Sequence, residues 1–192
     1  MSGEDFLRIF EEKEAILRGH FLLSSGLHSD IYVQCALVLQ EPELAGKLCG
    51  TLAGRFREKE INLVVGPALG GIIVSFEVAR YLGVRSIFTE RVEGRMCLRR
   101  GFRIEKGERV LLVEDVITTG KSLSEVKDVV EEWGGKIEGV GCLVNRSGGV
   151  RLFGKKIESL LSIPLKNYSP PECPLCRKNI PLTKPGSRHL SR

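Results

Sequence analysis

The stretch of sequence that decides the fold is VLLVEDVITTGKS, residues 110–122. Residues 110–113 form an unbroken apolar run, which is typical of a strand buried on both faces of a parallel sheet. Two carboxylates follow, Glu114 and Asp115, and a segment with hydroxyls and a glycine then leads into a helical pattern over residues 123–133. We therefore predict a central strand whose carboxyl end meets a turn and a helix N-terminus, where open α/β sheets bind ligands.

The chemistry of this turn indicates a ligand that is both a sugar and a phosphate. The first N–H groups of a helix lack partners and carry the positive end of its dipole, so a phosphate fits there. The hydroxyls of Thr118, Thr119 and Ser122 would add donors. Glu114 and Asp115 would repel a phosphate unless they face hydroxyl groups or a metal ion. A phosphorylated sugar satisfies both halves of the segment.

The nearest rival motif is the P-loop, GxxxxGK[ST], whose last three positions match Gly120, Lys121 and Ser122. Its first glycine would fall at position 115, where this chain has Asp115. A carboxylate at the point where backbone must wrap a triphosphate argues against a nucleoside triphosphatase. An ordinary buried strand and capped helix would explain the apolar run but not the two acids.

Residues 113–122, VEDVITTGKS, resemble the phosphoribosyl pyrophosphate (PRPP) motif of the type I phosphoribosyltransferases. In that family the acid pair holds the 2- and 3-hydroxyls of the ribose, and the loop holds the 5-phosphate. The resemblance implies an α/β fold with a central, mostly parallel twisted sheet flanked by helices and a small N-terminal hood. It also implies PRPP contacts at Glu114, Asp115, Val116, Ile117, Thr118, Thr119, Gly120, Lys121 and Ser122.

A second unit of strand, glycine turn and helix precedes the first. Residues 61–65 predict a buried strand, residues 66–71 (GPALGG) a turn, and residues 72–81 a helix. Glycines permit close approach of the backbone, so the turn could bind another anionic group through N–H donors; a plain turn is the alternative. In the resembled family this loop contacts pyrophosphate, and the matching residues are Ala68, Leu69, Gly70 and Gly71.

Residues 85–90 predict a strand that leads into a basic segment without clear periodicity, RVEGRMCLRRG, residues 91–101. A charge run is usually a solvated face, but a basic loop at this end of the sheet could close over pyrophosphate. Orotate-using members of the family have a mobile loop here that reaches across a dimer. Arg91 is the best match to the basic residue of that loop in the family. The resemblance implies further contacts to pyrophosphate from Arg95, Arg99 and Arg100.

Residues 136–145 predict the next strand of the sheet, so Arg146 should emerge at the ligand end. A guanidinium can hold a carboxylate through two parallel hydrogen bonds, although a surface arginine would look the same in sequence. In the family, the arginine after this strand and the first threonine of the phosphate loop contact orotate. The resemblance therefore implies an orotate site at Thr118 and Arg146.

The N-terminal segment is predicted to be a helix, starting near Phe6 and ending near Gly19. Residues 19–34, GHFLLSSGLHSDIYVQ, suit a loop between strands, and they resemble the hood signature of the orotate-using enzymes. Ser24 stands where relatives often carry a lysine, so a charge contact from that position is not expected. A further helix is predicted over residues 43–56, with Pro42 at its start.

The last strand is predicted over residues 157–163, before a basic, proline-rich tail that contains Cys173 and Cys176. Two thiolates are half of the ligands that a structural zinc site requires. The pair could be a half-site completed by a symmetry mate, a redox pair or a tight turn, and we favour the turn. Similar CPLC and KPGSR tails occur in a branch of the orotate-using enzymes.

Length and composition predict a single domain of 192 residues, with a hood and N-terminal helix in 1–40, a core in 41–165 and a tail in 166–192. No apolar run is long enough to span a bilayer, and acids interrupt any signal-peptide pattern, so we expect a cytoplasmic protein. Six scattered cysteines do not form the framework of a secreted domain. The net charge of +5 suits anionic substrates but is too small to indicate nucleic-acid binding.

The resemblance implies transfer of a phosphoribosyl group from PRPP to orotate, in pyrimidine biosynthesis. Glu114 and Asp115 would hold the ribose as positive charge grows at its anomeric carbon. Arg91 and a magnesium ion, bound through the substrate and not directly by the protein, would stabilise the departing pyrophosphate. We expect a homodimer without nucleic-acid or membrane partners. The alternatives are a purine-base phosphoribosyltransferase, which has no use for Arg146, and a PRPP-binding regulator of nucleic acid.

Overall fold

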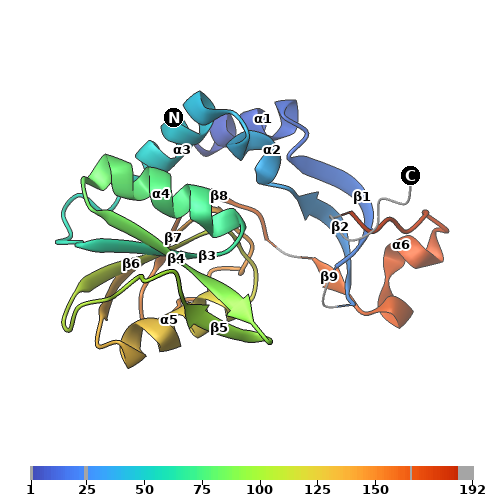
Figure 1. Cartoon of the computed structure of the whole chain (residues 1–192). Coiled ribbons are helices and arrows are strands. Elements are labelled where there is room, and N and C mark those ends of the chain that lie inside the picture. Colours follow the sequence, from blue (N-terminus) through green and yellow to red (C-terminus); the bar gives the residue numbers. More distant parts are fainter. Residues whose placement is uncertain (1, 24–25, 165, 186–192) are drawn as a thin grey trace.

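The computed structural model describes residues 2–23, 26–164 and 166–185, which form a large and a small sheet (Figure 1). The large sheet has the strand order β5-β4-β3-β6-β7-β8. The small sheet, here called the hood, has the order β1-β2-β9. All neighbours in the large sheet are parallel except β4 and β5. Its strands are β3 (Leu63–Pro67), β4 (Arg85–Val92), β5 (Arg95–Leu98), β6 (Arg109–Ile117), β7 (Lys136–Asn145) and β8 (Ile157–Ser162).

The central position predicted for residues 110–113 is confirmed, because β6 lies between β3 and β7. All four side chains are fully buried, and they alternate between the two faces of the sheet. Leu111 and Val113 pack into one apolar cluster, and Val110 and Leu112 into the other. Burying each of these side chains stabilises the fold by about 1.5–3 kcal/mol.

Helices cover both faces of the large sheet, as predicted for this fold class. Figure 1 shows α3 (Pro42–Gly54) and α4 (Gly70–Leu82) above it and α5 (Lys121–Glu132) below it. Leu52 and Val78 belong to the cluster on the first face, and Val126 to that on the second. None of the helices in the described part of the chain has the length and apolar character needed to cross a membrane.

The strand that carries the acid pair is longer than predicted. It continues through Glu114 to Ile117, because this part pairs with Cys142–Asn145 of β7 in register: Glu114 opposite Cys142 and Ile117 opposite Asn145. The strand was predicted to end on the two acids, and Val116 and Ile117 extend it beyond them. The helix after β3 likewise begins at Gly70, two residues before the predicted start.

The N-terminal prediction is wrong beyond the first three helical turns. The helix α1 (Gly3–Glu12) begins with a capping box between Ser2 and Asp5 and ends at Glu12. The chain then turns through Glu14, whose φ is 52°, and β1 (Ile16–Leu22) follows. Pairing of Ile16 and Leu17 with β2 outweighs the helical periodicity of the segment.

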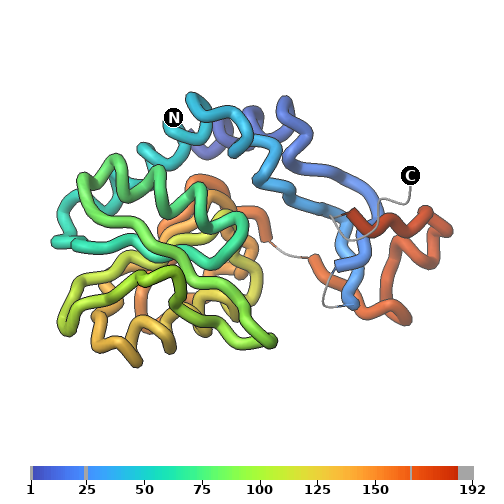
Figure 2. The backbone as a smooth tube through the Cα atoms, viewed as in Figure 1, coloured from blue at the N-terminus to red at the C-terminus, as the bar shows by residue number. Residues whose placement is uncertain are grey.

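The hood combines both ends of the chain. Strand β1 pairs antiparallel with β2 (His28–Val33), and β2 pairs antiparallel with β9 (Asn167–Tyr168) from the tail. After β9 come η1 (Pro170–Glu172) and α6 (Pro174–Arg177). Near the end of the described tail, Thr183 N–H donates to His20 O at 2.8 Å. The tube in Figure 2 shows the red C-terminal segment lying against blue β1 and β2. The short helix α2 (Ala36–Leu39) leads from the hood to α3.

Candidate active site

The acid pair is partly buried towards the carboxyl end of β6. Burial, and to a lesser degree the charge of Asp115, raise the pKa of Glu114 to about 8, against a hydrogen bond from the Ser122 hydroxyl that lowers it. Burial also raises the pKa of Asp115, against backbone N–H donors that lower it. Both carboxylates would therefore be stabilised by a ligand that offers hydroxyl donors or positive charge.

The hood reaches this acid pair, as the predicted hood signature requires. The pKa of Tyr32 is raised by burial and by the negative charge of Asp115. The thiol of Cys35, just after β2, donates to the backbone oxygen of Asp115 with a sulfur–oxygen distance of 3.7 Å. One wall of the site is therefore β2 and the residues that follow it.

The two helix N-termini predicted to bind anions flank the acid pair. The N-cap residues of α4 and α5, Leu69 and Gly120, make no side-chain hydrogen bond to the described start of either helix. At α4, a Cβ atom on Gly70 would lie 2.5 Å from the Asp115 carboxyl group. At α5, Gly120 has a φ of 77°, which favours glycine, and Thr119 Oγ1 accepts a hydrogen bond from Lys121 N–H at 3.4 Å. Two groups of backbone N–H donors thus lie beside two carboxylates.

The predicted pyrophosphate loop is divided between a turn and a helix. Ala68 N–H is already used, since it donates to Thr89 O at 2.7 Å, and the Ala68–Leu69 peptide bond is cis. Leu69 is 83% exposed. Gly70 and Gly71 form the first turn of α4, where N–H groups lack helical partners. Of the four predicted residues, these two glycines have the geometry of anion donors.

The basic segment is a β-hairpin and not the irregular loop that was predicted. Val92 pairs with Arg95 across a tight turn in which Glu93 and Gly94 both have positive φ, 49° and 83°. Two positive φ values are the mark of a type I′ turn, which suits the twist of a hairpin. The weak periodicity of four residues in β5 concealed this edge strand from sequence reasoning.

The four arginines of the basic segment, residues 91–101, differ in their surroundings. Arg91 lies on β4, donates to Gly94 O at 3.1 Å and forms an ion pair with Glu125 of α5. Arg100 donates to Glu90 at 3.1 Å and lies over the Phe88 ring. The other two are exposed and form no ion pair with any described residue: Arg95 and Arg99.

Arg146 is a buried cation beneath the hood. It is 4% exposed, and its Nη2 donates to Ser29 Oγ at 3.3 Å and to Ile31 O at 3.1 Å. Burial lowers its pKa, and the charge of Asp30 opposes that shift. Its Nε has no hydrogen-bond partner among the described residues. A buried guanidinium with an unused donor is suited to an anionic ligand.

Arg146 and Thr118 are brought to the same edge of the sheet. The Arg146 N–H donates to Ile117 O at 2.7 Å, one residue before exposed Thr118. The predicted orotate residues thus lie at neighbouring strand ends. The prediction for Ser24 falls outside the described residues.

Comparison with known proteins assigns the family. The family described as "Phosphoribosyl transferase domain" matches residues 38–169. The orotate phosphoribosyltransferase of Desulforamulus reducens is 52% identical over 191 residues, which cover 100% of both chains. That of Pelotomaculum thermopropionicum is 53% identical over 190 residues, 99% of this chain and 100% of the relative.

The chain belongs to the orotate phosphoribosyltransferase family. Among solved structures, that of orotate phosphoribosyltransferase from Aeropyrum pernix superimposes with a TM-score of 0.68, at 26% identity, over 81% of this chain and 92% of that one. The phosphoribosyltransferase fold predicted from the sequence is confirmed. The family motif coincides with β6 and the start of α5, where the acid pair and the uncapped helix meet.

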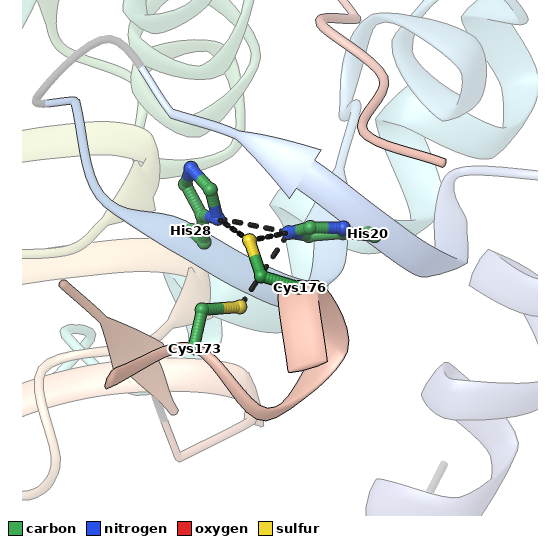
Figure 3. A group of neighbouring side chains, drawn as sticks. All are labelled: His20, His28, Cys173 and Cys176. Atoms are coloured by element: carbon green, nitrogen blue, oxygen red, sulfur yellow. Dashed lines mark hydrogen bonds between the residues drawn. The ribbon is translucent and has the colours of Figure 1, made fainter. Parts of the chain in front are cut away.

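Sequence reasoning missed one cluster of polar side chains in this orotate phosphoribosyltransferase family member. His20 and His28 lie against Cys173 and Cys176 of the tail (Figure 3). A signal was present, because these are two of only three histidines in the sequence, and they flank the turn of the predicted hood. The CxxC pair was considered alone because nothing in the local pattern connects it to residues so distant in the chain.

Proposed function

We propose that the chain transfers the 5-phosphoribosyl group of PRPP to orotate, giving orotidine 5-phosphate and pyrophosphate, a step of pyrimidine nucleotide biosynthesis. The observation that carries this proposal is Arg146, a buried guanidinium under the hood whose Nε has no hydrogen-bond partner in the part of the chain that the structure describes. Relatives of this chain that are about half identical over its whole length are named for the same activity.

PRPP is proposed to lie across the carboxyl ends of β3 and β6. Its ribose hydroxyls would donate to Glu114 and Asp115, and this contact favours the ionised carboxylates whose pKa values are raised in the free protein. Its 5-phosphate would accept from the first turn of α5 and from Thr118 and Thr119, and its pyrophosphate from the first turn of α4.

Arg91 is proposed to act on the leaving pyrophosphate. It lies on β4, the neighbour of β3, and its guanidinium is already held towards α5 by Glu125. Release from this partly exposed ion pair should cost little, since pairs near the surface are worth about 0–1 kcal/mol. Arg95 and Arg99, which are exposed in the same basic segment, are proposed as further contacts, whereas Arg100 is held against Glu90.

Magnesium is proposed as the cofactor, bound mainly through oxygens of PRPP. The two adjacent carboxylates, with pKa values raised by burial, are the kind of oxygen donors that fit a cation beside a polyphosphate. When bound, the ion would neutralise negative charge on the departing pyrophosphate. Glu114 and Asp115 would stabilise positive charge at the anomeric carbon through the ribose hydroxyls they hold.

Orotate is proposed to bind between Arg146 and the hood. Its carboxylate would accept from Arg146 and from Thr118 at the neighbouring strand end. The orotate anion is already nucleophilic, so no protein base is required. The hood strand β2 would help to exclude water, which matters because a cation-like sugar would otherwise be hydrolysed.

A cytoplasmic homodimer is proposed as the working form, with each chain a single domain: hood 1–40, core 41–165 and tail 166–192. Supporting the dimer, α4 exposes an apolar stripe in which Ile73 is 43% and Phe76 61% exposed, close to Leu69. Replacing Phe76 with Glu should halve the mass measured by light scattering. Val150→Glu, at a position that is also exposed, should leave the mass unchanged.

The test of the reaction is an assay with PRPP and Mg²⁺ in which orotate, adenine and hypoxanthine are supplied separately. We expect orotate absorbance to fall only when PRPP is present, with one pyrophosphate released per orotate consumed. Consumption of a purine but not of orotate would overturn the proposal in favour of a purine-base enzyme. Nucleic-acid binding with no turnover of any base would favour a regulator instead.

A further inference from the structure

Four metal-ligating side chains converge within the hood. They come from β1, from the start of β2 and from the two ends of the CxxC segment around α6: His20, His28, Cys173 and Cys176. One ligand atom from each lies within 4.8 Å of all the others. Figure 3 shows the two sulfur atoms and the two imidazole rings turned towards a common centre.

The spacing of these atoms matches the coordination sphere of zinc. With bonds of about 2.3 Å to sulfur and about 2.0–2.1 Å to nitrogen, a tetrahedral ion holds its nitrogen and sulfur ligands about 3.6 Å apart. His20 Nε2 lies 3.5 Å from Cys173 Sγ and 3.7 Å from Cys176 Sγ. His28 Nδ1 lies 3.3 Å from Cys176 Sγ. The two nitrogens are 2.8 Å apart, so His28 need shift by only about half an ångström to reach the tetrahedral separation.

The tautomer of His20 suits a metal ligand. Its Nδ1 lies 2.8 Å from the carbonyl oxygen of Ile180, which can only accept a hydrogen bond. The ring proton is therefore on Nδ1, and the lone pair of Nε2 faces the cluster. Such a bond to a backbone carbonyl is the usual outer support of a metal-bound histidine.

Hydrogen bonds alone account poorly for this cluster. His20 Nε2 has one lone pair but three potential donors around it, namely His28 Nδ1 and the two thiols. His20 is 2% exposed, His28 5% and Cys173 0%, so these three residues are shielded from bulk water. A single cation satisfies all four atoms at once.

We propose that His20, His28, Cys173 and Cys176 bind one Zn²⁺ ion that fastens the C-terminal tail to the hood. Two thiolates and two imidazoles in a tetrahedron select zinc over magnesium or calcium, which prefer oxygen ligands. Four protein ligands leave no open position, so the site is structural and not catalytic. The partner that would complete the CxxC half-site is therefore in the same chain.

The metal would stabilise a part of the molecule that has little core of its own. The hood sheet has three strands, one of them only two residues long, and Cys176 lies 148 residues from His28 in the sequence. Small units of this kind are commonly held by metals or disulfides. Ser29, which follows His28, contacts Arg146, so the ion also positions the hood strand that meets the base site.

The test is the metal content of the full-length chain purified with reducing agent and without chelator. We expect about one zinc per chain by mass spectrometry of the metal. Cys176→Ser should lose the zinc, and Cys97→Ser, which removes a partly exposed thiol outside the cluster, should keep it. Chelator should lower the melting temperature of the wild type and of Cys97→Ser, but not that of Cys176→Ser.

Cobalt substitution in the wild-type chain gives a result that does not depend on any variant folding. We expect one Co²⁺ per chain, with the strong visible absorption of a tetrahedral ion and the near-ultraviolet charge-transfer band of cobalt–thiolate bonds, both displaced by zinc. Absence of these bands after cobalt titration of the reduced protein, from which zinc and then the chelator have first been removed, would overturn the proposal. So would equal zinc content in Cys176→Ser and the wild type, or a Cys173–Cys176 disulfide in the protein as purified.

Discussion

A Cβ atom placed on Gly70 would lie 2.5 Å from both Cγ and Oδ2 of Asp115. The start of α4 is thus in direct contact with the acid pair on β6, and the two strand–turn–helix units form one site. Gly66 is similarly confined, because a Cβ atom there would collide with the carbonyl of Gly71. These glycines allow the N–H groups of α4 to approach whatever Asp115 binds.

Gly70→Ala should therefore impair catalysis more than stability. The added methyl group must displace the Asp115 carboxylate, so we expect kcat/KM for PRPP to fall by at least about tenfold, or roughly 1.4 kcal/mol of transition-state stabilisation. Gly54→Ala is the matched control, since a Cβ atom there meets nothing within 4 Å. Steady-state kinetics and a melting curve on both variants measure the effect. Equal kcat/KM values in Gly70→Ala and Gly54→Ala would show that the close contact between Gly70 and Asp115 does not matter for catalysis.

Asp115→Asn should reduce turnover while the chain stays folded. The amide is nearly the same size but cannot carry the negative charge proposed to face the ribose hydroxyls. We expect a loss of about 10²–10³-fold in kcat, the range seen when one preorganised electrostatic contact is removed. The decrease in orotate absorbance measures it. Full activity in this variant would contradict the assigned ribose contact.

Glu114→Gln should stabilise the free protein at alkaline pH, even though it removes a site residue. The pKa of Glu114 is raised from 4.5 to about 8, mainly by burial. Between these values the native state binds more protons than the unfolded state, so wild-type stability falls as pH rises through this window. Glutamine cannot ionise, so the variant avoids the buried negative charge that Glu114 acquires as the pH rises.

Melting temperatures without substrate test this pH dependence. The variant should gain several degrees over the wild type above about pH 8 and show little advantage at about pH 5. A difference between the two proteins that is constant with pH would mean that Glu114 titrates normally. Glu125→Gln, at an acid that pairs with Arg91 on the protein surface, serves as the control for removal of a carboxylate.

Arg146→Lys should weaken orotate binding and leave PRPP binding almost unchanged. Lysine keeps a positive charge but loses the paired donors of the guanidinium, including Nε, which is without a partner in the described chain. A charged hydrogen bond is worth about 1.5–3 kcal/mol, so KM for orotate should rise by roughly 10- to 150-fold.

Arg151→Lys is the control for this substitution, because that arginine is exposed and, among the described residues, donates only to Gly154 O. Separate titrations of orotate and PRPP distinguish the outcomes. If KM rises equally for both substrates, Arg146 acts by supporting the hood through Ser29 and not by holding the base.

Local patterns were sufficient to predict much of the fold and the strand ends at which the candidate site residues lie. The buried strand, the acid pair and the helix start lie within residues 110–122, and β7 has the predicted bounds. The helix predicted to end near Gly19 and the irregular loop predicted over residues 91–101 were wrong. Both segments became strands by pairing with a neighbour, β1 with β2 and β5 with β4, and short strands of this kind have weak periodicity.

The sequence by itself determined the parts of this protein that depend on neighbouring residues: the apolar strand, the two carboxylates and the glycine turns. Only the tertiary structure decided which distant side chains meet. It buried Arg146 against Ser29, packed Gly70 onto Asp115, and brought His20 and His28 to Cys173 and Cys176. The physical reason is that hydrophobic periodicity reports the burial of one face of a segment, whereas contacts between segments depend on how whole sheets and helices pack.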